Sequence, residues 1–277
     1  MMPDRTNGGS GMAGERKDTW AAGRLYEPYV GRWSRLVAKD LLRWLGAAEG
    51  LDWLDVGCGT GGVSEVILQQ AQPRCVRGVD SSAEFVEHAQ AHVTDPRAAF
   101  KVGDAQSLPV GSAQFDAAVS GLVLNFVPKP ALAVQEMKRA VRPGGVVAAY
   151  VWDYARRMEL MRYFWDAAVA LDREALELDE GYRFPLCQPE PLLELFSQAG
   201  LGEVEAKAID VDTVFRDFDD YWTPFLGAQG PAPGYAASLD DERRDALRDR
   251  IRAALPFSGD GSIPLVARAW AVRGRVS

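Results

Sequence analysis

Between residues 51 and 152, short apolar runs alternate with segments of helical periodicity. The apolar runs have the length and composition of buried strands and lie at 51–57, 75–80, 98–104, 115–121 and 146–152. The helical segments lie at 62–71, 83–94 and 130–141. A chain that alternates strands with helices in this way predicts a parallel sheet with helices on both faces.

Beyond Asp153 this alternation is interrupted twice. Residues 204–215 and 263–274 have the pattern of two further strands, while 154–184 and 217–260 are long, largely helical insertions. We therefore predict an α/β fold, a doubly wound, Rossmann-like sheet of seven mostly parallel strands with helical lid insertions. Ligands of such sheets bind at the carboxyl ends of the strands. Those ends carry Gly57, Asp80, Asp104 and Ser120.

The two ends of the chain differ from this pattern. Residues 1–18 are rich in glycine and almost free of apolar side chains, so we expect a disordered tail. Residues 19–277 are expected to form one domain, in which 19–45 are helical and aromatic. The aromatic side chains in that segment include Tyr26, Tyr29 and Trp33.

Composition excludes several classes of protein. Hydrophobic residues make up 47% of the 277 residues and charged residues 25%, which is typical of a globular protein rather than a disordered one. No apolar run reaches the ~18 residues of a membrane span, and the first residues lack the apolar stretch of a secretion signal. Cys58, Cys75 and Cys187 show no C-x-x-C spacing, which favours reduced thiols in the cytoplasm.

The charge balance disfavours nucleic acid as a partner. Lys and Arg number 31 and Asp and Glu 39, a formal net charge of −8, whereas proteins that grip a phosphate backbone normally present a basic surface. His88 and His92, the two histidines, have the i, i+4 spacing of metal ligands, but no third ligand is apparent, so we predict no metal site.

The strongest motif is LDVGCGTGG at residues 54–62, between a predicted strand and a predicted helix. Gly57, Gly59 and Gly62 satisfy the G-x-G-x-x-G pattern of a turn against which a cofactor lies, and Asp80 is the acid expected about 20 residues on, at a ribose. Both features also fit a nicotinamide-dependent oxidoreductase.

Asp55 distinguishes a site for a dinucleotide from a site for a cationic cofactor. It lies two residues before Gly57, where a carboxylate repels the pyrophosphate of a dinucleotide but attracts the ammonium and sulfonium of S-adenosylmethionine. The motif therefore favours a cationic cofactor, with the oxidoreductase kept as the alternative.

Four motifs in order carry a family resemblance. They are LDVGCGTGG, GVDSS, GDAQSLPVGSAQFDAAVSGLVLNFVP and EMKRAVRPGGVV. Together they resemble the class I S-adenosylmethionine-dependent methyltransferases, and most closely the small-molecule branch that includes the ubiquinone and menaquinone enzymes. The C-terminal strand pair resembles the reversed β-hairpin of that family.

The resemblance implies a set of cofactor-binding residues. The turn with Gly57, Gly59 and Gly61 would lie against the adenosine and the methionine, and Asp55 near the methionine ammonium. Asp80, followed by Ser81, would hold the ribose hydroxyls, and Asp104, Ala105 and Gln106 would lie at the adenine. Ser120 resembles a position close to the methionine end. In the helix that often covers the cofactor in this family, Tyr26, Tyr29, Arg32 and Trp33 are the candidates, the arginine for the methionine carboxylate and the aromatic faces for the sulfonium.

The predicted reaction is methyl transfer to a small, largely apolar molecule by in-line displacement, in which alignment rather than acid catalysis does most of the work. The sequence identifies no residue as a general base, and the catalytic residues stay unassigned. Asn125, Asp153 and Tyr154 follow strand ends and are candidates to orient the acceptor. A catalytically silent methyltransferase-like binding protein is a further alternative, and we expect a monomer or a homodimer without membrane partners.

Overall fold

The computed structural model describes residues 31–227 and 230–277, and its centre is a seven-stranded sheet in the order β3-β2-β1-β4-β5-β7-β6. Strands β1 to β5 are parallel, and β7 runs antiparallel to both β5 and β6. The strands are β1 (Asp52–Val56), β2 (Cys75–Asp80), β3 (Ala98–Val102), β4 (Phe115–Gly121), β5 (Val141–Trp152), β6 (Gly202–Phe215) and β7 (Ile263–Arg275). The predicted fold class, with its reversed C-terminal hairpin, is confirmed.

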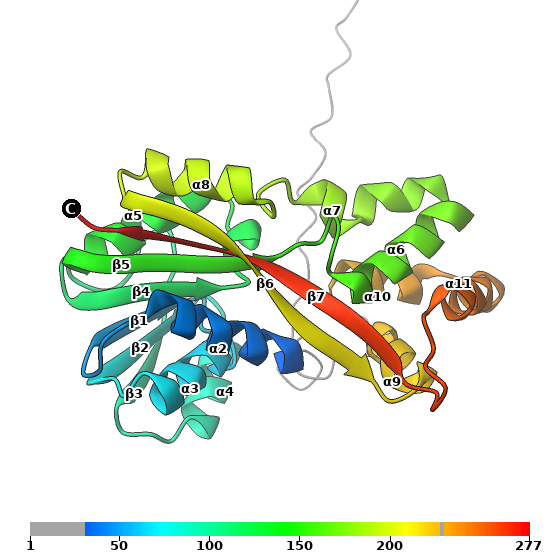
Figure 1. Ribbon diagram of the computed structural model, residues 1–277, viewed down its shortest axis with the longest axis horizontal. Coiled ribbons are helices and arrows are strands. Elements are labelled where there is room, and N and C mark those ends of the chain that lie inside the picture. Colours follow the sequence, from blue (N-terminus) through cyan, green and yellow to red (C-terminus); the bar gives the residue numbers. More distant parts are fainter. Residues whose placement is uncertain (1–30, 228–229) are drawn as a thin grey trace, which may run out of the picture.

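Helices cover both faces of the sheet (Figure 1). On one face lie α2 (Arg32–Leu45), α3 (Gly62–Gln70) and α4 (Ala83–His92), and on the other lie α5 (Pro130–Ala140) and α8 (Pro189–Gln198). All five residues of β1 are buried, because the central strand is covered from both sides. Such strands read as continuous apolar runs, which explains why the sequence located β1 and β4 well.

The C-terminal hairpin is longer than the rest of the sheet. β5 pairs with β7 only from Ala269 to Arg275, whereas β6 pairs with β7 along its whole length to Ile263. The outer half of the hairpin, in which β7 pairs with β6 but not with β5, extends away from the parallel strands, as Figure 1 shows. It supports a second group of helices.

We call this group, residues 154–184 with 217–227 and 230–260, the helical lobe. It contains α6 (Glu159–Leu171), η3 (Arg173–Leu178), α7 (Glu180–Arg183), α9 (Phe218–Trp222), η4 (Thr223–Gly227), α10 (Pro231–Ser238) and α11 (Asp241–Ala254). Its interior is aromatic: Phe164 stacks on Phe225 at 4.5 Å between ring centres, and the Tyr221 hydroxyl donates to the Leu160 carbonyl at 2.8 Å. The lobe thus has an apolar centre of its own.

One element boundary differs from the sequence-based expectation, and the structure divides the two insertions into shorter elements. β5 begins at Val141 rather than 146, because the backbone continues extended through a bulge opposite β4. The insertion over 154–184 is divided into α6, η3 and α7, with Asp172 and Asp179 as the N-caps of the last two. Within the insertion over 217–260, α10 begins at Pro231, since proline suits a first helical turn. The expectations for 1–18 and 19–30 lie outside the described residues.

Candidate functional site

The turn after β1 is built without side chains where the backbone folds back. Gly57 has φ +73°, and a Cβ there would lie 2.4 Å from Val123 Cγ2. Gly61 has φ +90°, and a Cβ there would lie 2.8 Å from Val93 Cγ2 on the loop after α4. Both positions require glycine, because an L side chain would be strained and would overlap its neighbour. The turn leads directly into α3, whose first amides have no acceptor within the helix.

Asp80 closes this turn from the end of β2. Its Oδ2 accepts from the Gly59 amide and its Oδ1 from the Ser82 amide, both at 2.9 Å. Burial raises the pKa of the Asp80 carboxyl above its ordinary value. Two backbone amides therefore fix the orientation of the carboxylate without using all of its acceptor capacity.

Two cavities meet at this carboxylate. The larger has a volume of about 310 Å³ and the smaller about 160 Å³. The walls of both include Gly57, Asp80, Ser81, Val123 and Phe126. An extended ligand could therefore pass from one to the other over Asp80.

The smaller cavity lies over the loop that follows β3. Asp104, Ala105 and Gln106 line it. The Asp104 Oδ1 accepts from the Gln106 amide at 2.8 Å, so this carboxylate also caps its own turn. Its second oxygen contacts the Gln106 side-chain nitrogen at 3.2 Å.

The larger cavity has a wall from α2 that the sequence analysis did not identify. Gly31, Ser34 and Arg35 line it. The Arg35 guanidinium contacts Glu65 Oε2 at 3.2 Å and lies over Gly62, whose added Cβ would be 3.7 Å from Arg35 Cζ. Arg35 is therefore the described arginine that faces the glycine turn.

The neighbouring candidates point elsewhere. Arg32 pairs with Asp220 at 3.2 Å and lies over the rings of Trp33 and Phe215, at 4.4 and 4.9 Å from their centres. Neither Arg32 nor Trp33 lines either cavity. Arg35 follows Arg32 by three residues on the same helix, so only the helical phase relative to the sheet distinguishes the two. Tyr26 and Tyr29 lie outside the described residues.

Two of the expected polar residues lie behind the cavity walls. Asp55 is fully buried, its Oδ2 accepts from the Ser64 hydroxyl at 2.7 Å, and burial raises its pKa to about 7. Ser120 is also fully buried, within β4. Neither residue lines a cavity. Asp55 can therefore act on a ligand through its charge, across the turn.

The far end of the larger cavity is apolar and aromatic. Leu122, Phe126, Trp152 and Tyr154 line it, and Phe184 lies behind them, with its ring centre 5.1 Å from that of Phe126. Leu122 has φ +62°, a strained conformation for a non-glycine residue of the kind found at functional sites. Of the expected acceptor-side residues, Tyr154 is on this wall, whereas Asn125 and Asp153 are not.

The expected lid segments contribute unequally. Tyr154 is the one residue of 154–184 on a cavity wall, and none of the described residues at 217–227 and 230–260 lies there. The aromatic side chains of these segments largely pack against one another inside the helical lobe. The buried ones are Phe164, Trp165, Tyr221, Trp222 and Phe225.

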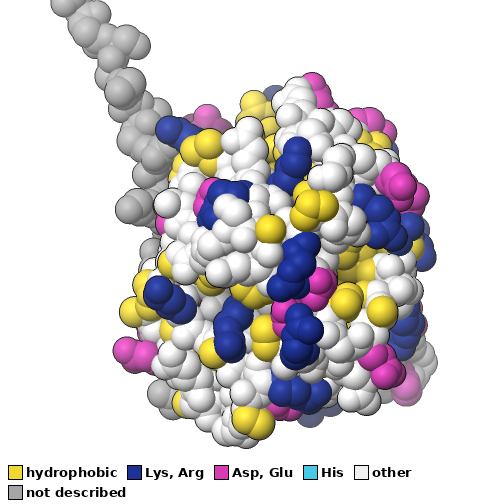
Figure 2. All heavy atoms as spheres, turned by 90° about the vertical axis from the view of Figure 1, so that its left-hand side faces the viewer, with side chains coloured by type: hydrophobic (Ala, Val, Ile, Leu, Met, Phe, Trp, Pro, Cys, Tyr) yellow, Lys and Arg dark blue, Asp and Glu magenta, His cyan; other side chains and the backbone are white. Residues whose placement is uncertain are grey.

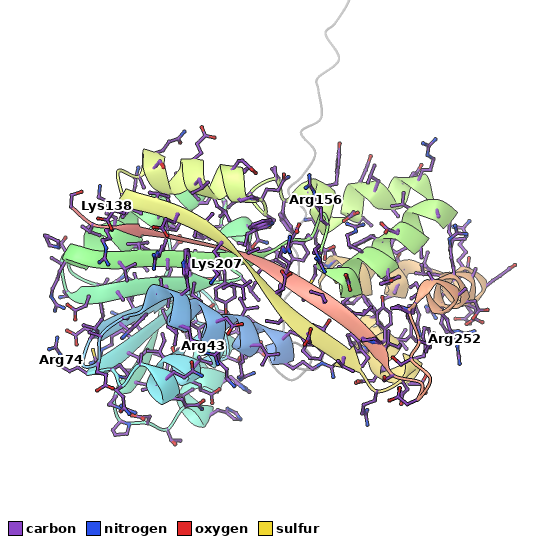
Figure 3. All side chains as sticks on the ribbon, viewed as in Figure 1. Arg43, Arg74, Lys138, Arg156, Lys207 and Arg252 are labelled. Carbon is purple, nitrogen blue, oxygen red and sulfur yellow. The ribbon has the colours of Figure 1, made fainter. Side chains whose placement is uncertain are left out.

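A third cavity, of about 440 Å³, opens at the opposite end of the sheet, where the parallel strands begin. Its charged side chains are paired: Arg142 with Asp116, Arg273 with Glu205, and Arg275 with Glu203. Figure 2 shows acidic side chains among the basic ones on this face. The labelled basic residues of Figure 3 lie far apart, from Arg74 beside the sheet to Arg252 on α11. The charged side chains of the third cavity therefore neutralise one another, and the cavity does not have the excess of positive charge that would bind an anion.

The described residues contain no group of three or more His, Cys, Asp or Glu side chains suited to a metal. His88 and His92 stack on each other at 3.9 Å on α4. In the described part of the chain, no helix is long and apolar enough to cross a membrane.

Comparisons with known proteins agree with this geometry. The model of the methyltransferase domain family matches residues 54–149. A demethylmenaquinone methyltransferase from Roseiflexus sp. is 31% identical over 170 residues, which cover 56% of this chain and 70% of the relative. A 2-methyl-6-phytyl-1,4-hydroquinone methyltransferase from Synechocystis sp. is 28% identical over 180 residues, or 64% of this chain and 55% of the relative. The chain spans 38% of the length of a further curated relative.

Solved structures share the architecture. Phosphoethanolamine N-methyltransferase 2 from Haemonchus contortus, solved in complex with S-adenosyl-L-methionine, has a TM-score of 0.55 and 18% sequence identity. The match covers 88% of this chain and 52% of that chain. At this identity the likeness shows a common fold.

Proposed function

Because this chain belongs to the S-adenosylmethionine-dependent methyltransferases, we propose that it transfers a methyl group to a small, largely apolar acceptor by in-line displacement. The observation that carries this proposal is the pair of cavities that meet at Asp80 and end in an aromatic wall. Family membership leaves the nicotinamide oxidoreductase alternative without support.

The residues present fit S-adenosylmethionine. Gly57, Gly59 and Gly62 present bare backbone to the larger cavity, and Asp80 offers acceptor oxygens that match the two hydroxyls of a ribose. We propose that Asp104, Ala105 and Gln106 hold the adenine and that Ser81 lies beside the ribose. When bound, the cofactor supplies a methyl group on a positively charged sulfur.

Arg35 is the proposed partner of the methionine carboxylate. Its guanidinium lines the larger cavity beside the glycine turn and is held by Glu65 at 3.2 Å. A guanidinium can keep one carboxylate partner and offer further N–H groups to a second. We propose Asp55 as the buried negative charge that favours the ammonium group from behind the turn.

The chain's own contribution to catalysis is alignment and exclusion of water. Phe126, Trp152 and Tyr154 form one wall of the larger cavity and suit a flat, largely apolar acceptor. Holding both reactants in line can lower the barrier by about 7–11 kcal/mol in favourable systems. Two relatives are named for methylation of a hydroquinone and of demethylmenaquinone, which supports a ring-shaped acceptor.

We further propose that the helical lobe closes the acceptor side as a lid. Phe184, from the lobe, contacts the ring of Phe126 on the cavity wall at 5.1 Å. A lid of this kind excludes water from the reacting groups. The three cysteines, Cys58, Cys75 and Cys187, are free, which supports a cytoplasmic location, and we propose a monomer or a homodimer.

Calorimetry with Asp80→Ala tests the proposal. The variant loses a charge-assisted hydrogen bond and leaves a ribose hydroxyl without an acceptor, which should cost about 1.5–3 kcal/mol of binding free energy. The affinity for S-adenosylmethionine should therefore fall about ten- to hundredfold. Asp212→Ala, which removes an exposed carboxylate of β6, is the matched control and should bind like the wild type. Equal affinity of a folded Asp80→Ala variant and the wild type would contradict the assignment.

Transfer of a labelled methyl group to a panel of small molecules then separates an enzyme from a catalytically silent fold. Tight binding of the donor without transfer to any acceptor would favour the silent binding protein. If Asp80→Ala transfers the methyl group as fast as the wild type, the chain is a methyltransferase, but Asp80 does not hold the ribose.

A further inference from the structure

The chain turns sharply at Leu122, directly after β4. Four non-glycine residues among those the structure describes have a positive φ: Gln72, Ala113, Leu122 and Glu203. The other three are exposed, whereas Leu122 is 7% exposed and lines the larger cavity. A left-handed backbone with a large branched side chain is strained, and such strain persists only where the surrounding structure requires it.

The backbone on either side of the turn shows what requires it. The Leu122 amide donates to the Tyr150 carbonyl at 2.8 Å, so this residue is still tied to β5. Beyond it the chain enters η2 (Leu124–Phe126), and Val123 lies so close to the glycine turn that a Cβ on Gly57 would be 2.4 Å from its Cγ2. The left-handed turn therefore directs Val123 and the end of η2 to the walls of both cavities.

The turn accounts for the backbone conformation of Leu122 but not for its side chain. Glycine adopts a left-handed conformation without strain, so the turn alone does not need leucine at this position. What leucine adds is a branched apolar group in the cavity wall, beside Trp152 and Tyr154. This group has no polar atom, so it acts on a ligand only through its shape and its contacts.

The sheet order puts this side chain between the proposed donor and acceptor sites. β4 lies between β1, which leads into the glycine turn, and β5, which ends at Trp152. Because a methyl group moves in line from donor to acceptor, the reacting end of the acceptor must lie between these two places. Leu122 is therefore on the wall at the point where the reactants meet.

We propose that Leu122 is a specificity-determining residue, which limits the bulk of the acceptor at its reacting end. This inference rests on the proposed function and deepens it by naming the acceptor class, apolar molecules whose reacting end is unbranched. The leucine side chain occupies the space that a branched group would need, and the strained turn keeps it there. Removal of this side chain should admit bulkier acceptors and leave the donor site unchanged.

Nuclear magnetic resonance of the leucine methyl groups tests the contact. The protein carries ¹³C in these groups and is saturated with S-adenosylhomocysteine, and the Leu122 signals are identified by their absence in Leu122→Gly. We expect toluene to shift these signals, because an aromatic ring that packs on a methyl group changes its chemical shift. tert-Butylbenzene, the same ring with a branched group, should shift them much less at equal concentration.

The same titrations give the affinities for the two probes. Apolar area alone favours tert-butylbenzene, which has more carbon atoms. We expect the wild type to reverse that order and to bind toluene about tenfold more tightly, and Leu122→Gly to bind tert-butylbenzene at least as tightly as toluene. Ala113→Gly is the matched control, because it relaxes a positive φ at an exposed residue that is not on the walls of the three cavities described above. Its affinity ratio should equal that of the wild type.

A comparison of two variants separates this role from ordinary packing. Leu122→Ala removes the side chain but keeps the strain, so it should unfold at a lower temperature than Leu122→Gly, the reverse of the order at positions with a negative φ. A side chain that only filled the core would leave the ratio of the two affinities unchanged when it is removed. Should either variant fail to fold, the wild-type Leu122 signals are assigned through their contacts with Val123, and their response to toluene decides.

The outcomes distinguish this inference from the proposed function. A wild-type protein that does not bind S-adenosylmethionine contradicts the proposed function. A protein that binds it overturns the inference alone if toluene leaves the Leu122 signals unmoved, if the affinity ratio is the same in Leu122→Gly, or if Leu122→Ala is the more stable variant.

Discussion

The half of the molecule that carries β1 to β5 and the helical lobe use their polar groups in opposite ways. In the sheet half, Asp80 is held by the backbone amides of Gly59 and Ser82 and still faces two cavities. In the lobe, Arg162 and Asp179 meet in a two-pronged ion pair, at 3.0 and 2.7 Å, that faces other protein groups. The Asp80 carboxylate thus stays available to a ligand, whereas the buried ion pair of the lobe serves the structure of the lobe itself.

The glycines and aromatic residues follow the same division. In the sheet half, bare backbone packs against Val123 at Gly57 and against Val93 at Gly61, where no side chain fits. The lobe fills its centre with stacked rings, such as Phe164 on Phe225. A cavity wall made of backbone suits a bound cofactor, whereas a packed aromatic centre suits a rigid wall.

One ion pair within the lobe links the two lobe segments that lie beside the larger cavity. Arg162 Nη1 donates to the carbonyl of Tyr154, a cavity residue, at 2.9 Å. Asp179, the partner of Arg162, also caps α7 through the Gly181 amide at 2.8 Å, shortly before Phe184. The pair therefore holds both the Tyr154 backbone and the segment that carries Phe184.

The largest expected effect comes from breaking this link. Arg162→Met keeps the aliphatic length but leaves Asp179 buried without its partner, which should cost about 3–5 kcal/mol of unfolding free energy. Chemical denaturation measures that loss, and Arg243→Met, which removes an exposed arginine of α11, is the control. If the halves are as separate as the comparison suggests, donor affinity in folded Arg162→Met is retained while methyl transfer falls. Loss of donor binding would break the comparison.

The next effect concerns the glycine turn of the sheet half. Gly57→Ala forces a left-handed backbone on alanine and puts its Cβ against Val123, so we expect donor affinity to fall by about a hundredfold, or 2.7 kcal/mol. Gly227→Ala is the matched control, because no atom lies within 4 Å of its added Cβ. Calorimetry compares the two. Donor binding by folded Gly57→Ala at the wild-type level would show that the turn does not contact the cofactor.

The smallest effect, counted per pH unit, is the change in stability caused by one buried carboxyl from each half. Burial raises the pKa of Asp55 from 3.8 to about 7 and that of Glu180 from 4.5 to about 8. A carboxyl whose folded-state pKa is raised stabilises the fold below its ordinary pKa and loses that contribution as the pH rises through the raised value. Between its ordinary pKa and its raised pKa, which we call its window, each carboxyl should lower the free energy of unfolding by about 1 kcal/mol per pH unit.

Thermal unfolding from pH 5 to pH 9 measures this, with Asp55→Asn and Glu180→Gln each removing one of the two dependences. The Asp55 window should close near pH 7 and the Glu180 window near pH 8. Bound S-adenosylmethionine, a cation, should lower the pKa of Asp55 and leave Glu180 unaffected. A donor-induced shift of the Glu180 window, or none of the Asp55 window, would contradict the division between the halves.

Much of the sheet half was predictable from the sequence, because its signals are local. Strands that are covered on both faces read as apolar runs, and positions 57 and 61 require glycine for reasons of backbone geometry alone. The lobe was harder to predict. Its helices are short and capped by Asp172, Asp179, Asp217 and Asp240, and its aromatic side chains read equally well as pocket walls or as core.

The sequence by itself determined the alternating sheet, the glycine turn, the acid at the end of β2 and the resemblance to methyltransferases. The tertiary structure decided which arginine of α2 faces the turn, because Arg32 and Arg35 differ only in helical phase. It also decided that Trp152 and Phe126, from two different strands' ends, share a wall with Phe184 behind it. Contacts between residues so distant in the chain depend on how whole elements pack, which no local pattern records.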